Sequence, residues 1–214
     1  MASPFTILVD ARSLVDPNAG GFGRVARRAL AALVLQADGA HFAFVTTGAV
    51  KPALPEPFAS QASVTHVHIP IPNKIWSAMC MFGITSLDRE AARRAGKSAD
   101  AVLLPNIGFV GRLAVPYALI LHDLSFLIEP RWFTPRMRLW HRAVNASGQI
   151  RRAVRLFCVS ETTARDAERL LNIPRDRLEV FHPGTGAEIE TGNLEPRSHN
   201  TGQEFPVPYS QYVL

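Results

Sequence analysis

Short apolar runs alternate with longer amphipathic segments along most of the chain. The apolar runs have the length and composition of buried strands in a parallel sheet, and we predict them at Phe5–Val9, His41–Thr46, Val64–Ile69, Ala101–Leu104, Tyr117–Leu121, Leu156–Val159 and Leu178–Phe181. Between them, apolar residues recur with helical spacing, which predicts helices within Phe22–Gln36, Asn73–Gly96, Pro135–Arg152 and Glu161–Leu171. This alternation predicts an α/β fold with a doubly wound parallel sheet of Rossmann-like topology.

The helix predicted between Pro135 and Arg152 has two different sides. One side carries Trp140, Val144, Ser147 and Ile150, so we expect Trp140 in the core. The other side carries Arg138, Arg142 and Arg152. Between Glu129 and Glu161 the chain has seven arginines and no acidic residue. Such a surface suits phosphates of lipids, nucleic acids or substrates, because guanidinium groups bind them bidentately. An ordinary solvated helix face stays the alternative.

The apolar periodicity stops near the C-terminus. Residues 1–182 are predicted to form one Rossmann-like domain, and 183–208, which are polar and glycine-rich, a linker or disordered segment. Residues 209–214 end in an apolar triplet that resembles the start of a strand. We therefore expect a further domain to begin there.

Composition sets limits on the class of protein. The 214 residues include 47% hydrophobic residues and carry a net charge of +5, which excludes a disordered or fibrous chain. No apolar stretch has the roughly 20 residues of a membrane-spanning helix, and the N-terminus lacks the features of a secretory signal. Cys80 and Cys158 are two isolated thiols in apolar contexts. A cytoplasmic location is expected.

The strongest local motif lies at the start of the first long helix, where Gly20, Gly21 and Gly23 precede Arg24. Glycines let a backbone approach a ligand closely, and a helix N-terminus favours an anion such as a diphosphate. A plain tight turn is the alternative. Gly21, Gly23 and Ala26 also satisfy G-x-G-x-x-A, so a dinucleotide-dependent oxidoreductase stays a weaker option. That fingerprint should follow its strand directly and be succeeded by a ribose-binding acid, and this sequence departs from it on both counts.

Polar residues follow two predicted strands. Asp10 and Arg12 come at the end of the first strand, and His122 and Asp123 follow Tyr117–Leu121. Because ligands of open α/β sheets gather at the carboxyl ends of the strands, we expect these residues and the glycines to face one crevice. His122 and Asp123 are the candidate catalytic pair, although a His-Asp pair also commonly satisfies loop backbone groups. His66 and His68 lack a third ligand, so no metal site is expected.

Four segments of the chain, in this order and spacing, resemble a known family. They are ILVDARSL, GGFGRVARRALAAL, ALILHDLSFLIEPRWFTPRMRLWHRAV and RLFCVSETTARDAERLLNIPRDRLEVFHPG. The chain is similar in them to the N-terminal half of GT-B glycosyltransferases of the large retaining group that includes bacterial mannosyltransferases (family 4-like).

The resemblance implies a transferase that moves a hexose such as mannose from a nucleotide sugar to a glycan or lipid-linked acceptor, with retention and without cofactor or essential metal. By motif match, Gly20, Gly21, Gly23 and Arg24 would lie near donor phosphates or acceptor, and His122 near the transferred sugar. The family's C-terminal domain, which holds most of the donor, would be missing. We therefore expect little or no transfer by these 214 residues alone.

The resemblance also gives the arginines a possible partner. Enzymes similar to this one often act on lipid-linked acceptors at a membrane, so we expect Arg138, Arg142 and Arg152 to face anionic lipid on the inner side of the membrane. A stand-alone module that binds an anionic sugar or lipid is the main alternative function. Nucleic acid is not an expected partner.

Overall fold

The computed structural model describes residues 5–183. Within them, seven strands form one sheet in the order β3-β2-β1-β4-β5-β6-β7, and every neighbouring pair is parallel. The strands are β1 (Phe5–Asp10), β2 (Ala40–Thr47), β3 (Val64–Ile69), β4 (Ala101–Leu104), β5 (Tyr117–Leu121), β6 (Arg155–Cys158) and β7 (Leu178–Val180). The predicted fold class, a doubly wound parallel sheet with Rossmann-like order, is confirmed.

Helices connect most of the strands. They are α1 (Arg12–Val15), α2 (Gly20–Gln36), α3 (Asn73–Met81), α4 (Leu87–Ala95), α5 (Ser125–Ile128), α6 (Pro135–Ala143), α7 (Ala146–Arg152) and α8 (Glu161–Leu171), with 3-10 turns η1 (Pro130–Trp132) and η2 (Arg175–Arg177). The four-residue helices α1 and α5 were not expected from the sequence, because so short a segment shows no periodicity. Ser160 caps α8 as predicted, and its hydroxyl accepts the Thr163 N–H at 3.1 Å.

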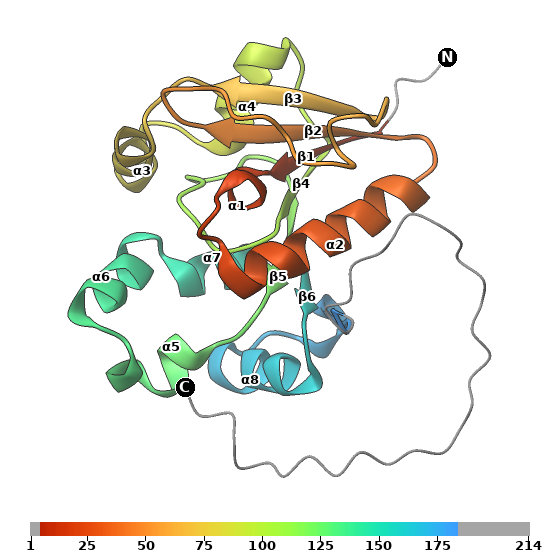
Figure 1. Cartoon of the computed structure of the whole chain (residues 1–214). Helices are drawn as coiled ribbons and strands as arrows, with labels where there is room; N and C mark the ends of the chain where they lie inside the picture. The colour runs from red at the N-terminus through yellow and green to blue at the C-terminus, as the bar shows by residue number, and fades with distance from the viewer. Residues whose placement is uncertain (1–4, 184–214) are drawn as a thin grey trace, which may run out of the picture. The chain divides into compact units, whose positions relative to one another are not determined.

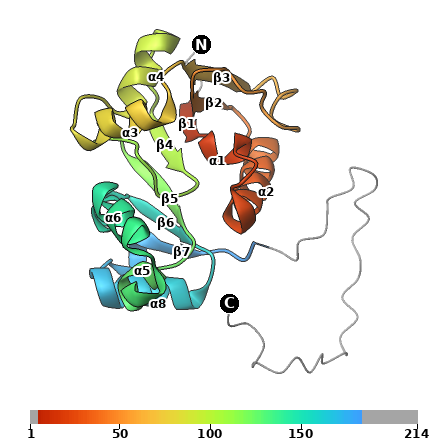
Figure 2. The same ribbon diagram turned by 60° about the vertical axis from the view of Figure 1, so that its left-hand side comes forward.

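Helices cover both faces of the sheet (Figure 1). Turning the molecule shows α1 and α2 on one side and α3 and α4 on the other (Figure 2). The core on the first side joins Leu14 and Leu30 to the strand residues Phe42 and Phe44. The larger core on the second side contains residues of α3, α4, α7 and α8, such as Trp76. Burial on both faces explains why the strands are almost continuously apolar.

The chain reverses its direction of growth across the sheet between β1 and β4. Strands β2 and β3 extend the sheet on one side of β1, and β4 to β7 extend it on the other. The connections that leave the carboxyl ends of β1 and β4 therefore diverge. Such a switch point is where open α/β sheets form their ligand crevice.

Two predicted helices are each divided in the structure. The segment Asn73–Gly96 forms α3 and α4, separated at Gly83, whose φ of +69° is easy only for glycine. The segment Pro135–Arg152 forms α6 and α7, separated at Asn145, which has a φ of +53°. Asparagine tolerates this left-handed conformation better than most residues, and the helix ends there.

The division between α6 and α7 makes the predicted position of Trp140 wrong. Val144 and Ile150 are buried, as expected, but Trp140 is 39% exposed and no residue of α6 is buried. Once the helix breaks at Asn145, α6 no longer shares the inward face of α7.

The predicted linker, 183–208, lies outside the described residues except for its first residue, and the predicted strand start at 209–214 lies outside them entirely. None of the helices within residues 5–183 combines the length and apolar character needed to cross a bilayer.

Candidate functional site

Two adjoining pockets open at the carboxyl edge of the sheet. The larger, about 660 Å³, lies at the β1–β4 switch point, and we call it the polar cleft; among its lining residues are Asp10, Arg12, Thr47, Asn73 and Ser77. The second, about 330 Å³, is the aromatic pocket, lined among others by His122, Asp123, Phe126, Phe133, Met137 and His141. The residues Phe22, Asn106, Ile107 and Trp140 line both. The predicted site residues after β1 and after β5 therefore line neighbouring parts of one crevice.

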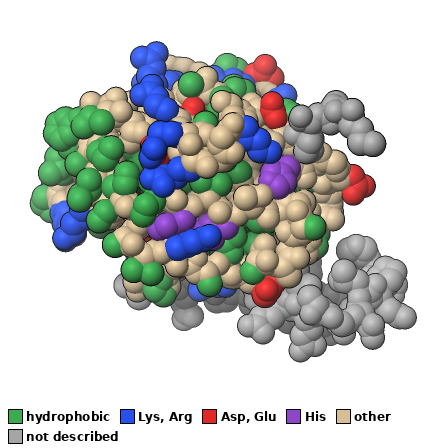
Figure 3. All heavy atoms as spheres, turned by 90° about the horizontal axis from the view of Figure 1, so that it is seen from above, with side chains coloured by type: hydrophobic (Ala, Val, Ile, Leu, Met, Phe, Trp, Pro, Cys, Tyr) green, Lys and Arg blue, Asp and Glu red, His purple; other side chains and the backbone are tan. Residues whose placement is uncertain are grey.

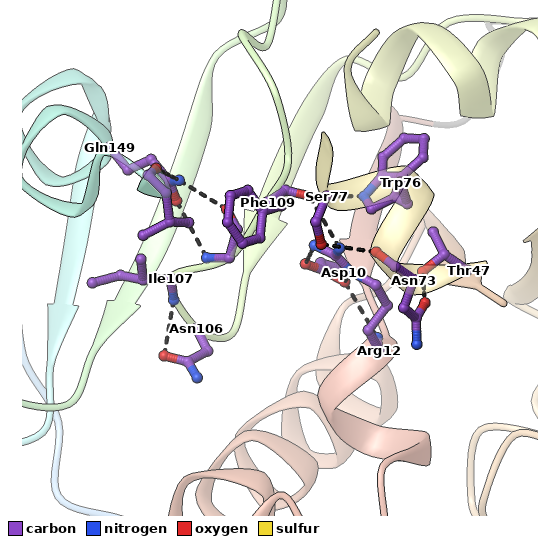
Figure 4. Close-up of polar contacts among 12 residues, drawn as sticks. Asp10, Arg12, Thr47, Asn73, Trp76, Ser77, Asn106, Ile107, Phe109 and Gln149 are labelled. Carbon is purple, nitrogen blue, oxygen red and sulfur yellow. Dashed lines mark hydrogen bonds and ion pairs between the residues drawn. The ribbon is translucent and has the colours of Figure 1, made fainter. Parts of the chain in front are cut away.

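Asp10 and Arg12 form an ion pair in the wall of the polar cleft (Figure 4). The guanidinium donates to the two carboxylate oxygens, with Nε at 2.8 Å from Oδ1 and Nη2 at 2.6 Å from Oδ2. Its Nη1 donates to the carbonyl of Phe109 at 3.0 Å. Burial by itself would lower the pKa of Arg12, but the charge and hydrogen bonds of Asp10 outweigh it and raise that pKa. Arg12 therefore joins the end of β1 to the connection after β4.

That connection, Pro105–Phe109, contributes Asn106 and Ile107 to both pockets and Gly108 and Phe109 to the polar cleft, and we call it the floor. Side chains from four elements or their ends hold it in place. The Phe109 carbonyl also accepts the Trp76 indole N–H at 2.8 Å, and Gln149 Nε2 donates to the Gly108 carbonyl at 2.8 Å. At its other end, the Pro105 carbonyl accepts His122 Nε2 at 2.9 Å. The floor is thus held in place before any ligand arrives, as a preorganised site requires.

Beside the Asp10–Arg12 ion pair, a short chain of hydrogen bonds also lines the polar cleft (Figure 4). The Thr47 hydroxyl at the end of β2 donates to Asn73 Oδ1 at 2.6 Å, and the Ser77 hydroxyl donates to the Asn73 carbonyl at 2.8 Å (Figure 4). The amide nitrogen of Asn73 makes no hydrogen bond with the described residues. Hydroxyls and amides of this kind are suited to a ligand rich in hydroxyl groups.

The glycines of α2 have different surroundings. A Cβ on Gly20 or Gly21 would meet nothing within 4 Å, so the first turn of α2 is open to a ligand there. A Cβ on Gly23 would lie 2.5 Å from Ala19 Cβ, so Gly23 is required for packing. Arg24 is exposed, makes no hydrogen bond or ion pair within residues 5–183, and lies three to four positions after the open glycines, on the same helical face.

The glycine segment and His122 come together through Phe22. The centroids of the Phe22 and His122 rings are 5.9 Å apart. Because a carbonyl can only accept, the bond to Pro105 requires the proton on Nε2 and leaves Nδ1 as an acceptor. Burial lowers the pKa of His122, opposed by the Pro105 bond and by Asp123. His122 is therefore a neutral acceptor at pH 7.

Asp123 does not orient His122 by a hydrogen bond within the described residues. Its Oδ1 accepts the Ser125 N–H at 2.8 Å and so holds the start of α5. Asp123 is nevertheless exposed and lines the aromatic pocket. The sequence left open whether Asp123 takes part in catalysis or satisfies loop backbone groups, and the bond to the Ser125 N–H shows that it does the latter. Its Oδ2 is available to a ligand.

Closely packed rings form most of the aromatic pocket. Phe126 stacks on His141 with centroids 4.5 Å apart and planes 4° apart, and Trp140 meets His141 edge-on at 5.1 Å. Trp140 also lies edge-on to Phe109 at 6.1 Å. Burial lowers the pKa of His141, against the Met137 carbonyl and Asp123, which raise it.

The three arginines predicted to share a face do not line the same hollow. Arg138 and Arg142 line one hollow beside Phe126, whereas Arg152 lines another with Arg112. All three of the predicted arginines are exposed.

His66 and His68 serve a structural purpose. His66 Nε2 lies 2.7 Å and His68 Nδ1 3.0 Å from the hydroxyl of Thr46. Within the described residues, no three His, Cys, Asp or Glu side chains gather as metal ligands would.

Sequence reasoning missed Asn106, Phe109 and Gln149, which shape the floor of the crevice. Gln149 is 4% exposed, and its amide also donates to the Val144 carbonyl at 2.7 Å. A polar residue on the inward side of a predicted helix was the only signal in the sequence. Phe109 contributes its backbone carbonyl, which no sequence pattern indicates.

Comparison with known proteins adds a family and a structural likeness. The family model described as Glycosyltransferase Family 4 matches residues 19–188. No curated protein matches the chain. Among solved structures, Arabidopsis thaliana UGT89C1 complexed with UDP-L-rhamnose is similar, with a TM-score of 0.48 and 12% identity over 86% of this chain. The match covers 49% of that structure, so the chain spans about half its length.

Proposed function

The chain belongs to glycosyltransferase family 4, and from that premise we propose that it forms the acceptor-side domain of a retaining enzyme that transfers a hexose such as mannose. The donor is a nucleotide sugar, and the acceptor is a glycan or a lipid-linked sugar. A second lobe would hold most of the donor and close the crevice.

One observation supports this proposal above all: the open first turn of α2 lies beside His122 at the carboxyl edge of the sheet. Loss of a nucleoside diphosphate from a sugar separates charge, with an oxocarbenium-like ring on one side and an anion on the other. The N–H groups of the first turn and the Arg24 guanidinium would stabilise the diphosphate. Neutral Nδ1 of His122 would accept a hydroxyl of the transferred sugar, and Asp123 a hydroxyl of either substrate.

Asp10 and Arg12 have a different place in this proposal. Their charged groups bind each other, and Arg12 also donates to the Phe109 carbonyl, so they would shape the polar cleft more than bind a charged ligand. Gly23 would likewise act through packing.

The proposal is tested by measuring transfer from labelled nucleotide sugars, using this chain and the longest protein its gene encodes. We expect activity in the longer protein and a loss of about 100-fold for His122→Ala, the scale of a misplaced substrate. His41→Ala is the control, because His41 lies at the start of β2, bonded to Thr65, at the opposite edge of the sheet. Full turnover by this chain alone would contradict the two-lobe proposal. Equal activity of His122→Ala would contradict the role of His122.

Two alternative functions predict different outcomes. A stand-alone binding module for an anionic sugar or lipid would bind its ligand and transfer nothing. A dinucleotide-dependent oxidoreductase would bind a nicotinamide cofactor in a spectroscopic titration. Against the latter, α1 separates Gly21 from the end of β1, whereas the dinucleotide turn joins its strand and helix directly.

We further propose peripheral contact with anionic membranes through Arg138, Arg142 and Arg152. Exposed apolar side chains accompany them, with Trp132 75% and Leu139 64% exposed. Hydrophobic side chains also gather at one edge of the molecule (Figure 3), and Phe82, directly after α3, is 73% exposed. Each arginine near an anionic surface contributes about 1 kcal/mol.

Cosedimentation with phosphatidylglycerol vesicles tests this contact. Changing Arg138, Arg142 and Arg152 to Gln should weaken binding by about two orders of magnitude, as three such contributions imply. The control changes Lys51, Lys97 and Arg165 to Gln, which removes the same charge from exposed sites outside α6 and α7. An equal loss in both triple variants would mean that only net charge matters.

A further inference from the structure

The lining of the aromatic pocket combines apolar rings with a polar edge. Phe22, Phe126, Phe133 and Trp140 provide the rings, and His122, Asp123 and Asn106 provide the polar groups. The Asn106 side chain uses its Oδ1 to accept the Ile107 N–H at 2.8 Å. Its amide nitrogen makes no hydrogen bond with the described residues, which leaves it available as a donor.

The pocket contains no cationic side chain among the described residues that line it. The basic residues of α6 lie elsewhere, with Arg138 and Arg142 lining the separate hollow beside Phe126. Both histidines of the pocket have their pKa lowered by burial, so they are neutral at pH 7. Asp123 is therefore the one formal charge in the lining. A phosphate or carboxylate placed here would lose water and meet a carboxylate without a compensating cation.

Two rings stand at the junction with the polar cleft. Phe22 is 44% exposed and Trp140 39% exposed, and both line the two pockets. They come from α2 and α6, on either side of the Pro105–Phe109 floor. Trp140 is held edge-on against Phe109 and His141, so the exposed part of its indole is a fixed apolar surface.

An uncharged pyranose has the chemistry that this lining requires. One face of such a ring presents C–H groups, which suit an aromatic surface, while hydroxyls around its rim can donate and accept hydrogen bonds. Asp123 would accept hydroxyl protons of this ring and the Asn106 amide would donate to it, which leaves His122 Nδ1 for the transferred sugar. Few polar groups in an otherwise apolar wall are typical of small-ligand sites.

We propose that the aromatic pocket is the acceptor-sugar subsite, that it selects an uncharged sugar ring over a phosphorylated or acidic one, and that Trp140 is its specificity-determining residue. The assignment of the ring to the acceptor rests on the proposed function. The charge preference and the role of Trp140 rest on the pocket itself, so they can be tested without a donor.

The experiment measures binding of small glycosides to the 214-residue chain by saturation-transfer NMR. Methyl α-D-mannopyranoside and methyl α-D-glucopyranoside are the neutral probes, and mannose 6-phosphate and methyl glucuronide the charged ones. We expect millimolar binding of at least one neutral probe, a range that corresponds to about −4 kcal/mol, and at least tenfold weaker binding of the charged probes.

Four variants locate the binding. Trp140→Ala should weaken binding of the neutral probe at least tenfold, and Trp140→Phe should keep the affinity for that probe within about threefold. The matched control is Trp132→Ala, because Trp132 is 75% exposed and lines neither pocket. Met137→Arg, which adds a cation to the lining from an exposed position on α6, should reverse the preference and favour mannose 6-phosphate. Thermal melts establish that each variant is folded.

Several results would overturn the proposal. They are tighter binding of a charged probe to the unchanged chain, equal loss in Trp132→Ala and Trp140→Ala, or no binding of any probe. The two proposals can fail separately. If neutral sugars bind at Trp140 but no nucleotide sugar supports transfer, the transferase proposal fails and the subsite stands. If transfer occurs and Trp140→Ala changes neither binding nor KM for a neutral acceptor, only the subsite fails.

Discussion

Arg12 and Arg24 show how far the contribution of one side chain depends on its neighbours. Both arginines were candidates for binding a substrate, but Arg12 lines the polar cleft and Arg24 lines neither pocket. Arg12 forms an ion pair with Asp10, a residue that is only 7% exposed. Arg24 is exposed and has no partner among residues 5–183. The first therefore maintains the structure of the crevice, and the second is available to a ligand.

Replacing Arg12 should destabilise the protein much more than replacing Arg24. Arg12→Ala removes the guanidinium that pairs with the largely buried Asp10 carboxylate and one of the two donors to the Phe109 carbonyl, which we expect to cost about 2 to 4 kcal/mol of unfolding free energy. Arg24→Ala should stay within about 0.5 kcal/mol, as surface changes do. Urea denaturation followed by circular dichroism measures both. Similar losses in the two variants would contradict the assigned roles.

The glycines of α2 give a second test at the same scale. Gly23→Ala should cost about 1 to 3 kcal/mol, because its new Cβ would lie 2.5 Å from that of Ala19. Gly21→Ala has open space around it and should be neutral or up to about 1 kcal/mol more stable. Thermal unfolding distinguishes them. If Gly21→Ala is the more damaging change to stability, the first turn of α2 is closely packed at Gly21 and not open.

At the scale of elements, the crevice depends on how α3, α7 and β5 hold the floor. Trp76 of α3 and Gln149 of α7 each donate a hydrogen bond to the Pro105–Phe109 connection. His122, which directly follows β5, donates to the carbonyl of Pro105, the first residue of that connection. Gln149 is also joined to β5, because the Tyr117 hydroxyl donates to its carbonyl at 2.7 Å. The floor of the site is therefore coupled to the packing of α7 against the sheet.

Removing the Gln149 amide should weaken the fold and displace the floor. Gln149→Leu has a similar size but leaves the carbonyls of Gly108 and Val144 without a donor, at an expected cost of about 2 kcal/mol. Gln36→Leu, on the exposed last residue of α2, is the control. Amide exchange of Gly108 and Phe109 should accelerate in the first variant alone. Unchanged exchange there would mean that the other contacts hold the floor.

At the scale of the whole molecule, partly buried histidines make stability depend on pH. Five histidines, namely His41, His66, His68, His122 and His141, have their pKa lowered, with burial as the main cause. The largest effect is on His66, whose pKa falls to about 4, with smaller contributions from Lys51 and His68. The fold favours the neutral form of each ring.

Stability should therefore decline as the pH falls below neutrality. The unfolded chain binds a proton at His66 near pH 6.5, and the folded chain only near pH 4. The contribution is fully present above about pH 6.5 and is lost progressively as the pH falls to 4. Between pH 6.5 and pH 4, the Tm of His66→Gln should fall by several degrees less than the Tm of the unchanged protein. A Tm that is independent of pH between 7 and 4 would contradict the burial of these rings.

The sequence by itself determined the strands, the helices α2 and α8 and the class of fold. Continuous apolar runs are required by burial on both faces of a parallel sheet, and this requirement is local enough to read residue by residue. Gly20, Gly21 and His122 were recognised as candidates for the same local reason, since each follows or begins an element. Their predicted roles in binding or catalysis are proposals that await measurement.

Only the tertiary structure decided which partners these residues have. Because the helix breaks at Asn145, Trp140 is partly exposed and lines both pockets, although helical periodicity predicted it in the core. The bonds of Arg12, Trp76 and Gln149 to one loop join residues up to 97 positions apart, as the Arg12–Phe109 contact does. Backbone carbonyls accept most of these bonds, and their positions depend on how distant elements pack, which no local pattern encodes.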